Sequence, residues 1–322
     1  MADPHPTEAR FPAVPVEAGH YESFYLKACH PAEPLGIWIR YTVHKRPDAL
    51  PNGSLWVTLF DGASEGPRAH KQTKPGPTAA GGDWIRVGEA SMRAGGASGA
   101  IDGAEWDLRF AGSEPPLFHL PRAWMYRARL PRTKLLSPVP AARFDGSLRV
   151  DGRTIAVDGW RGVIGHNWGA QHAERWIWLH GLTEAGDWLD AALGKVKLGR
   201  LTTPWVASGA LALGGERLAL GGPGRKVEVR EAPQRCDFVV GGRGVGVRGA
   251  VTAARKDIAG WVYADPDGPE HNTVNCSIAD MRLEVERGGG APRELNVRSA
   301  AAYELGMRER DHGIPIQPFP DG

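Results

Sequence analysis

Glycine and proline interrupt this chain too often for long helices to form. The 322 residues include 43 glycines and 26 prolines, spread along the whole length, and both residue types end or weaken helices. Between these breaks lie short segments in which apolar and polar side chains alternate. In residues 36–45, the apolar side chains on one side of the expected strand are Ile37, Ile39, Tyr41 and Val43. The pattern predicts an almost all-β protein built from sandwiches or barrels.

Expected strands recur along nearly the entire chain. A proline-rich stretch at residues 114–140 separates two series of them and predicts a long loop that crosses a barrel mouth. We expect strands at residues 23–29, 36–45, 54–60, 68–73, 83–87, 97–101, 105–110, 147–150, 154–158, 162–167, 175–181, 188–197, 211–213, 226–230, 236–240, 245–252, 261–264, 273–283 and 298–305. Only short helices are expected, for example around residues 170–174.

The length of the chain predicts two modules, because 322 residues exceed what one hydrophobic core usually organises. Residues 1–18 contain four prolines and are expected to form an extended lead-in. The break in the strand pattern at Pro204 places the boundary near residue 200. We therefore expect an N-terminal β-module at residues 19–200 and a C-terminal β-module at residues 201–322.

Charge and cysteine content narrow the class of protein. The net charge of +2 provides no general attraction for nucleic acid, so no nucleic-acid partner is expected. The three cysteines, Cys29, Cys236 and Cys276, form no C-x-x-C pair and fit a reducing compartment. No apolar run approaches the roughly 18 residues of a membrane helix, and no signal peptide is visible. We expect a cytoplasmic protein without an integral membrane segment, and its oligomeric state stays open.

The segment at residues 165–181 carries the densest pattern of aromatic and ionisable side chains. If residues 175–181 form a strand, Trp176, Trp178 and His180 share one face. His166 and Trp168 form a second pair of this kind on the preceding segment. An imidazole at the end of an aromatic wall suits an apolar binding pocket with a catalytic group.

The next expected strand places Trp188 and Asp190 on one face. A carboxyl group surrounded by indoles loses solvation, so we expect the pKa of Asp190 to rise and the group to stay protonated near neutral pH. Such an acid could protonate an alkene or a carbonyl while aromatic faces stabilise the cation. The ordinary alternative is that the tryptophans are core and that the histidines and Asp190 are hydrogen-bonded structural residues.

Other motifs carry weaker signals. Residues 244–249 match G-x-G-x-x-G, but no βαβ unit surrounds them, so we interpret them as a glycine-rich hairpin. His166, His172 and His180 lack the spacing of metal ligands, and no metal site is predicted.

Three further places could contact a ligand. Arg40 belongs to a basic cluster at a strand end that could meet a ligand carboxylate, although a solvated turn is the commoner explanation. Tyr263 and Asp265 repeat the aromatic-x-acid spacing, but the Pro-Asp-Gly that follows predicts a turn. His271 and Asn275 could line the junction between the modules.

The segment GHNWG…HAERWIWLHG resembles the lipocalin-like superfamily that includes carotenoid hydratase, AttH-like proteins and tocopherol cyclase. ESFYLKA and GIWIRYTVHK…GSLWVTLFD resemble its first module, and WVYADPDGPEHNTVNCSIADMRLEVE and YELG…DHGIPIQPFPDG resemble its second. The resemblance implies two lipocalin-like β-barrels with an apolar pocket in or between them. It also implies hydration or cyclisation of a hydrophobic substrate without a cofactor. The hydratase H-x-W motif falls on His166 and Trp168, and the aromatic-x-Asp motif on Trp188 and Asp190, where Trp188 replaces a tyrosine.

These observations predict a cofactor-independent isomerase, cyclase or hydratase for an apolar, unsaturated, isoprenoid- or polyketide-like small molecule. Asp190 is the expected general acid, His166 would orient it or relay the proton, and His180 is a secondary acid/base candidate. The expected substrate-binding wall consists of Trp38, Trp56, Trp168, Trp176, Trp178 and Trp188. The alternatives are a non-catalytic carrier of a hydrophobic ligand and a structural protein with filled barrels.

Overall fold

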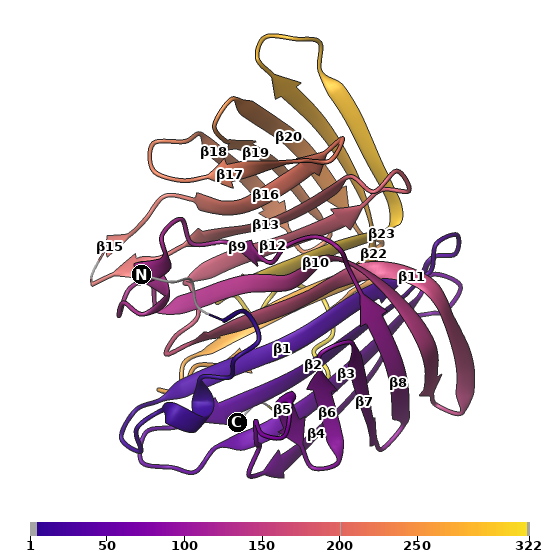
Figure 1. Ribbon diagram of the computed structural model, residues 1–322, viewed down its shortest axis with the longest axis vertical. Coiled ribbons are helices and arrows are strands. Elements are labelled where there is room, and N and C mark those ends of the chain that lie inside the picture. Colours follow the sequence, from indigo (N-terminus) through magenta and orange to yellow (C-terminus); the bar gives the residue numbers. More distant parts are fainter. Residues whose placement is uncertain (1–4, 200, 321–322) are drawn as a thin grey trace.

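The computed structural model describes residues 5–199 and 201–320 and contains two large, strongly curved antiparallel sheets, shown one above the other in Figure 1. The first sheet contains β1 (His20–Cys29), β2 (Leu35–Lys45), β3 (Asn52–Asp61), β4 (Arg68–Pro75), β5 (Asp83–Val87), β6 (Ala90–Arg93), β7 (Gly96–Ile101), β8 (Ala104–Ala111), β9 (Leu117–Phe118), β10 (Thr133–Val150) and β11 (Arg153–Gly169). Its strand order is β4-β3-β2-β1-β11-β10-β8-β7-β6-β5, and β9 pairs with β10.

The second sheet forms the C-terminal module. It contains β12 (Arg175–Leu182), β13 (Trp188–Lys195), β16 (Val206–Leu213), β17 (Glu216–Gly221), β18 (Val227–Ala232), β19 (Arg235–Gly241), β20 (Val245–Thr252), β21 (Ala259–Ala264), β22 (Glu270–Arg287) and β23 (Arg293–Met307). Its order is β17-β16-β13-β12-β23-β22-β20-β19-β18, and β21 pairs with β22. A bridge links Leu220 of the edge strand β17 to Gly242, which directly follows β19 near the other edge, so this sheet nearly closes into a barrel. The short strands β14 (Lys197–Leu198) and β15 (Leu201–Thr202) pair separately.

Strand β2 contributes buried side chains to the cores of both modules, one from each of its faces. Its Ile37 and Ile39 belong to the core of the first module, as the alternation predicts. The side chains that point the other way, Trp38 among them, are also buried, because the second module packs against this face. Burial on both faces explains why β2 has no exposed residue along its whole length.

The N-terminal lead-in packs against the first module. It contains one short 3-10 turn, η1 (Phe11–Ala13), whose Phe11 joins the core of that module. The Lys45 ammonium group at the end of β2 donates hydrogen bonds to the carbonyl oxygens of Val16 and Ala18, both at 2.6 Å. Residues 5–18, the described part of the expected lead-in, consist of turns and this 3-10 turn and are held against the first module.

The chain passes from the first sheet to the second between Gly169 and Arg175, about 30 residues earlier than predicted. The predicted boundary, residue 200, lies outside the described residues. Strands β12 and β13, expected in the N-terminal module, pair with β23 and β16 of the second sheet. The helix expected around residues 170–174 is wrong, because this connection has no helical residues. The expected long loop ends earlier, at Thr133, where β10 begins.

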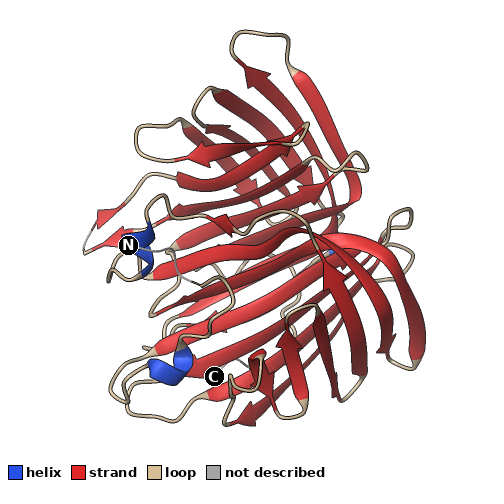
Figure 2. Ribbon diagram, viewed as in Figure 1, coloured by secondary structure: helices blue, strands red, loops and turns tan. Residues whose placement is uncertain are grey.

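The all-β fold class is confirmed, as Figure 2 shows. The helices of the described chain are three single 3-10 turns: η1, η2 (Ala123–Tyr126) and η3 (Arg255–Asp257). Within the described ranges, none is long or apolar enough to cross a membrane.

Candidate active site between the two modules

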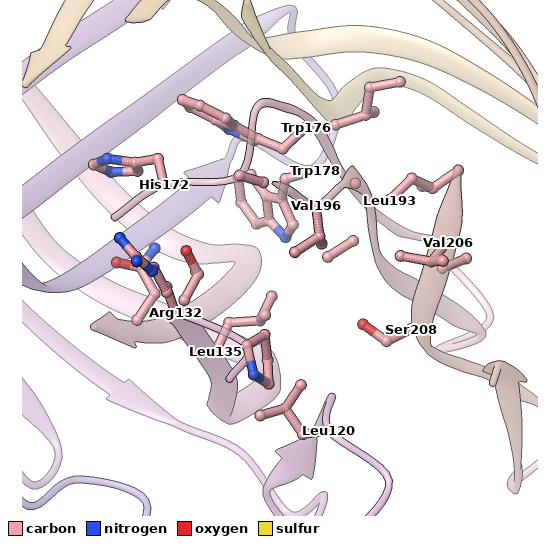
Figure 3. Close-up of a pocket in the computed structure, with 18 of the residues that line it drawn as sticks. Leu120, Arg132, Leu135, His172, Trp176, Trp178, Leu193, Val196, Val206 and Ser208 are labelled. Atoms are coloured by element: carbon pink, nitrogen blue, oxygen red, sulfur yellow. The ribbon is translucent and has the colours of Figure 1, made fainter. Parts of the chain in front are cut away.

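A cavity of about 500 Å³ lies between the two sheets, a volume in the usual range for small-molecule sites. Its first wall is the outer face of β1, β2, β10 and β11, with Tyr21, Tyr25, Trp38, Arg40, Leu135 and Asn167. The opposite wall comes from β12, β13, β16 and the C-terminal module, with Trp176, Trp178, Leu193, Ser208, Tyr263 and Glu304. Figure 3 labels part of this lining, namely Leu135 of the first wall and Trp176, Trp178, Leu193 and Ser208 of the opposite wall, together with Leu120 and Arg132 from the loop before β10. Most of this lining is apolar.

The two indoles of β12 face the cavity because side chains alternate along a strand. Trp176 and Trp178 line the cavity, whereas Ile177 and Leu179 belong to the core of the C-terminal module. The alternation predicted for residues 175–181 is thus confirmed. Trp38 contributes an indole from the opposite wall.

The connection between β11 and β12 carries His172, which lines the cavity. Its Nδ1 lies 2.7 Å from Oδ1 of Asp265, and its backbone N–H donates to the same oxygen at 2.7 Å. Asp265 follows directly after β21, so the two residues approach from 93 positions apart in the chain. The His172 ring stacks on Tyr21 with ring centroids 4.0 Å apart and on Trp176 at 5.3 Å.

Asp265 is ionised, and its negative charge helps to hold the imidazole of His172 in one orientation. Burial would raise the pKa of its carboxyl group, but the hydrogen bonds and positive field of His172 outweigh burial and lower the pKa. The carboxylate therefore accepts the Nδ1–H of His172. Nε2 of His172 makes no hydrogen bond within the described residues. A ring held in this way can take a proton at Nε2 or deliver one.

A second histidine, His271, lies next to Asp265. Nε2 of His271 lies 3.5 Å from Oδ2 of Asp265, and the His271 ring is 5.0 Å from that of Trp176. Burial, reinforced by the positive charges of His172 and Arg308, lowers the pKa of His271 to about 3. His271 is consequently neutral at physiological pH and does not compete with His172 for the negative charge of Asp265.

Glu304 is the carboxylate of the cavity wall within the described lining. Its Oε1 accepts a hydrogen bond from the Trp176 indole at 2.9 Å. Its Oε2 accepts from the Tyr263 hydroxyl and from the Asn275 amide, both at 3.2 Å. These bonds fix the orientation of Trp176 and leave Glu304 well satisfied.

Asp190 does not have the properties expected of a general acid. It is fully buried, with Oδ1 accepting from the Trp178 indole at 3.1 Å and Oδ2 accepting from the Ser137 hydroxyl at 2.5 Å. Burial would raise its pKa, but the neighbouring His119 ring, His180 and the Ser137 hydroxyl together lower the pKa. The expectation of a raised pKa is wrong, because the sequence did not show these partners. Asp190 is ionised and orients Trp178.

His166 lies in the interior of the first module instead of the cavity. Its Nε2 bonds Oε1 of Glu22 at 2.8 Å, and its Nδ1 bonds the carbonyl oxygen of Pro6 at 2.9 Å. The predicted contact with Asp190 is absent from the bonds of both described residues, which have other partners. The carboxylate of Glu22 also accepts the backbone N–H groups of Arg10 and Phe11. This group of residues holds the lead-in on the first module.

The remaining predicted residues lie outside the cavity lining. His180 is fully buried, its Nε2 donates to the Pro140 carbonyl at 2.9 Å, and burial lowers its pKa to about 4. The Trp168 ring lies beside that of His166 at a tilt, and Trp188 packs among alanines and leucines beside Arg217. Trp56 is buried against Trp261 and Tyr263. These three indoles are core residues, which is the ordinary alternative considered for them.

Sequence reasoning missed the His172–Asp265 pair as a site. His172 was considered only as a metal ligand, and it lies in the segment expected to form a helix. Asp265 was assigned to a turn, and a turn is present, since Gly268 N–H donates to its carbonyl oxygen at 2.9 Å. The available signal was the Tyr263-Ala-Asp265 spacing, which places an aromatic residue in the cavity wall and an acid just beyond the strand end.

The sequence comparisons connect this chain to mycobacterial relatives. No family model matches it. An uncharacterized protein of Mycobacterium tuberculosis, Rv0493c in strain H37Rv, is 28% identical over 305 residues, which cover 90% of this chain and 87% of that protein. The protein MT0513 of strain CDC 1551 matches with the same identity and coverage.

Solved structures share the fold at low sequence identity. A Nitrosomonas europaea protein assigned as AttH has a TM-score of 0.57 and 13% identity, covering 96% of this chain and 99% of its own. Kievitone hydratase from Nectria haematococca has a TM-score of 0.58 and 11% identity, covering 90% and 89%. CghA with Sch210972 has a TM-score of 0.61 and 12% identity, covering 95% of each chain. The chain therefore has the two-module, lipocalin-like fold of these AttH, hydratase and CghA structures, as the sequence resemblance predicted.

Proposed function

We propose that this chain is a cofactor-independent hydratase, cyclase or isomerase that acts on an apolar, unsaturated small molecule in the cavity between the modules. The observation that carries the proposal is the His172–Asp265 pair, a proton-exchanging group in the wall of a largely apolar cavity. Burial of the carboxylate and stacking of the imidazole hold the pair in one orientation. This arrangement is suited to general acid–base catalysis.

In this proposal, His172 moves protons and Asp265 is the positioning residue. Asp265 fixes the tautomer with hydrogen on Nδ1, so that the Nε2 lone pair faces the reactant. Nε2 takes a proton from carbon or from an attacking water, and the imidazolium then gives it to another atom of the substrate. The sum is an isomerisation, a cyclisation or an addition of water, and no oxidant or reductant is consumed. The faces of Trp176 and Trp178 stabilise positive charge on the unsaturated substrate.

The fold neighbours support this class of reaction. One of them is a hydratase by name, and another was solved with the small molecule Sch210972. General acid–base catalysis replaces the general acid first expected at Asp190, because that carboxyl group is ionised and its oxygens are occupied. Asp190 contributes by orienting Trp178, and His166 and His180 act in stability.

A deuterium-transfer assay tests the proposal. Addition of water places a solvent hydrogen on the substrate directly, and a proton held on Nε2 during isomerisation or cyclisation exchanges with solvent before it is returned. The protein is therefore incubated in D2O with a panel of apolar enones and polyenes. Mass spectrometry then measures deuterium in the recovered compounds. We expect uptake for the wild type and a loss of about 10²–10⁴-fold for His172→Gln. The matched control is His70→Gln, because His70 forms a surface pair with Asp151 at 2.9 Å outside the cavity.

A non-catalytic carrier is the alternative, and the predominantly apolar lining of the cavity favours it. Native mass spectrometry of the same mixtures separates the two functions. A carrier holds compounds of the panel and releases them without deuterium, with the same result for the wild type and for His172→Gln. That outcome would replace the enzymatic proposal.

A further inference from the structure

Arg40 is a buried guanidinium group in the cavity wall, and its charge plays no part in the proposed proton transfer. It lies on β2 among the residues that line the cavity, with 6% of its surface exposed. Its Nε donates to the Ser23 hydroxyl at 2.8 Å. The guanidinium lies over the Tyr263 ring at 4.3 Å and over the Trp56 ring at 5.6 Å. These contacts fix the plane of the group.

No carboxylate of the described chain forms an ion pair with Arg40. Buried arginines are normally paired, because removing the charge from water costs several kcal/mol. A hydroxyl group and two aromatic faces offset only part of this cost. The terminal nitrogens therefore remain available on the cavity side of the group.

The two nearby carboxylates have partners of their own. Glu304 accepts hydrogen bonds from Trp176, Tyr263 and Asn275. Asp265 accepts from the backbone and the ring of His172. Neither lies within ion-pair distance of Arg40 among the described residues. Arg40 is consequently different from the structural arginines of this chain, such as Arg175, which contacts Glu231 and Glu309 at 2.7 Å.

We propose that Arg40 is an anion subsite, and that the ligand of the cavity is an apolar, unsaturated molecule with a carboxylate group. This inference rests on the proposed function and adds the polar group of the substrate class. The carboxylate would accept hydrogen bonds from the terminal guanidinium nitrogens, while the hydrocarbon part extends along Trp176 and Trp178. Binding the carboxylate at Arg40 would fix which part of the hydrocarbon chain meets His172, which lines the same cavity.

Two probes that differ only in charge test the subsite. cis-Parinaric acid is a polyene carboxylate whose fluorescence rises in an apolar environment, and its methyl ester has the same polyene without the charge. Both are titrated at pH 8 into the wild type, Arg40→Met and Arg46→Met. Arg46→Met is the matched control, since it removes an exposed arginine just beyond the end of the same strand.

We expect the wild type to bind the acid more tightly than the ester by about tenfold or more, the usual contribution of a charge-assisted hydrogen bond. Arg40→Met should bind both probes with the affinity that the wild type has for the ester, and Arg46→Met should keep the preference for the acid. Equal affinity of the wild type for the two probes would overturn the subsite. A preference for the acid that survives in Arg40→Met would overturn it as well.

The stability of Arg40→Met provides an independent readout. Removing an unpaired buried charge should leave the midpoint of urea unfolding unchanged or raise it. A clear fall of the midpoint with the acid preference retained would make Arg40 a structural residue of the interface between the modules and would overturn the subsite. Failure of the subsite is distinguishable from failure of the proposed function. In the first case both probes bind equally well, and in the second the acid is preferred although no deuterium enters any compound. If neither probe binds the wild type, both are overturned.

Discussion

Among the buried histidine–carboxylate pairs of the described chain, two have similar geometry but very different surroundings. The His166–Glu22 pair lies inside the first module, and the His172–Asp265 pair lies in the wall of the cavity between the modules. Both pairs have short N···O distances, 2.8 Å and 2.7 Å. The distance between the partners therefore does not distinguish the structural pair from the pair proposed to be catalytic.

The two pairs differ in what the second ring nitrogen of each histidine contacts. Nδ1 of His166 faces the carbonyl oxygen of Pro6, and Nε2 faces Glu22, so both ring nitrogens face acceptors. Both ring nitrogens of His166 are thus occupied by acceptors, and neither is open to a substrate. His172 uses one ring nitrogen for Asp265 and keeps the other for the cavity. A histidine can exchange protons with a substrate only if one of its nitrogens is free.

The largest expected effect follows from changing Asp265 to asparagine. The substitution keeps the size of the side chain but permits the other tautomer of His172, so turnover should fall by about 10²–10⁴-fold. Deuterium transfer per folded molecule measures the loss, and circular dichroism checks the fold. If Asp265→Asn retains full turnover, the two pairs do not differ in the way described.

Changing Glu22 to glutamine should affect stability and leave turnover per folded molecule intact. Although Glu22 is buried, hydrogen bonds and charges of His166 and His20 lower its pKa from 4.5 to about 2. Its stabilising contribution is complete above pH 4.5 and is lost as the pH falls toward 2. Glu22→Gln removes the buried carboxylate that bonds His166 and the backbone N–H groups of Arg10 and Phe11, so the free energy of unfolding should fall by about 3 kcal/mol at pH 7. Urea denaturation of both proteins measures this change, and an unaltered midpoint would contradict it.

His180 provides a reference, because this buried histidine has no carboxylate within ion-pair distance in the described chain. Its pKa falls from 6.5 to about 4 on folding. The unfolded state therefore binds a proton that the folded state does not, and stability decreases as the pH falls from 6.5 to 4, by about 3 kcal/mol from this group. Urea midpoints for His180→Gln should depend less on pH in this window. An identical pH profile for variant and wild type would refute the assignment.

The smallest expected effect concerns the two indoles beside the pairs. Trp176→Phe removes the hydrogen bond from the indole to Glu304 and should cost about 1.5 kcal/mol of stability. Trp168 makes no side-chain hydrogen bond within the described residues, so Trp168→Phe should cost less. Thermal unfolding of both variants compares the two sites. The prediction is contradicted if Trp168→Phe is the more destabilised of the two.

Local patterns in the sequence predicted the strands and the faces of their side chains. The alternation at residues 175–181 correctly placed Trp176 and Trp178 on one face, because side-chain direction in a strand depends only on position along it. It did not show which surface that face would meet. Trp168 follows the same rule and faces the interior of the first module, where it contacts Tyr126.

Contacts between distant segments could not be predicted in this way. The pKa of Asp190 depends on His119 and Ser137, which β9 and β10 bring from the first module. The pairing of His172 with Asp265 depends on the order of β12, β23, β22 and β21 in the second sheet. A single sequence specifies such long-range order only through the packing of the whole molecule, and the motif search therefore selected Asp190 and His166 instead of the pair at the cavity.

The double-sided burial of β1 and β2 means that neither half of this protein is a self-sufficient folding unit. Trp38 and Cys29 belong to the first sheet but complete the hydrophobic core of the second. A fragment that ends at Gly169 would expose these side chains to water and tend to self-associate. The intact chain is therefore expected to unfold cooperatively in a single transition. Replacing one module with that of a related protein would preserve the fold only if both buried faces of β1 and β2 still matched the modules packed against them.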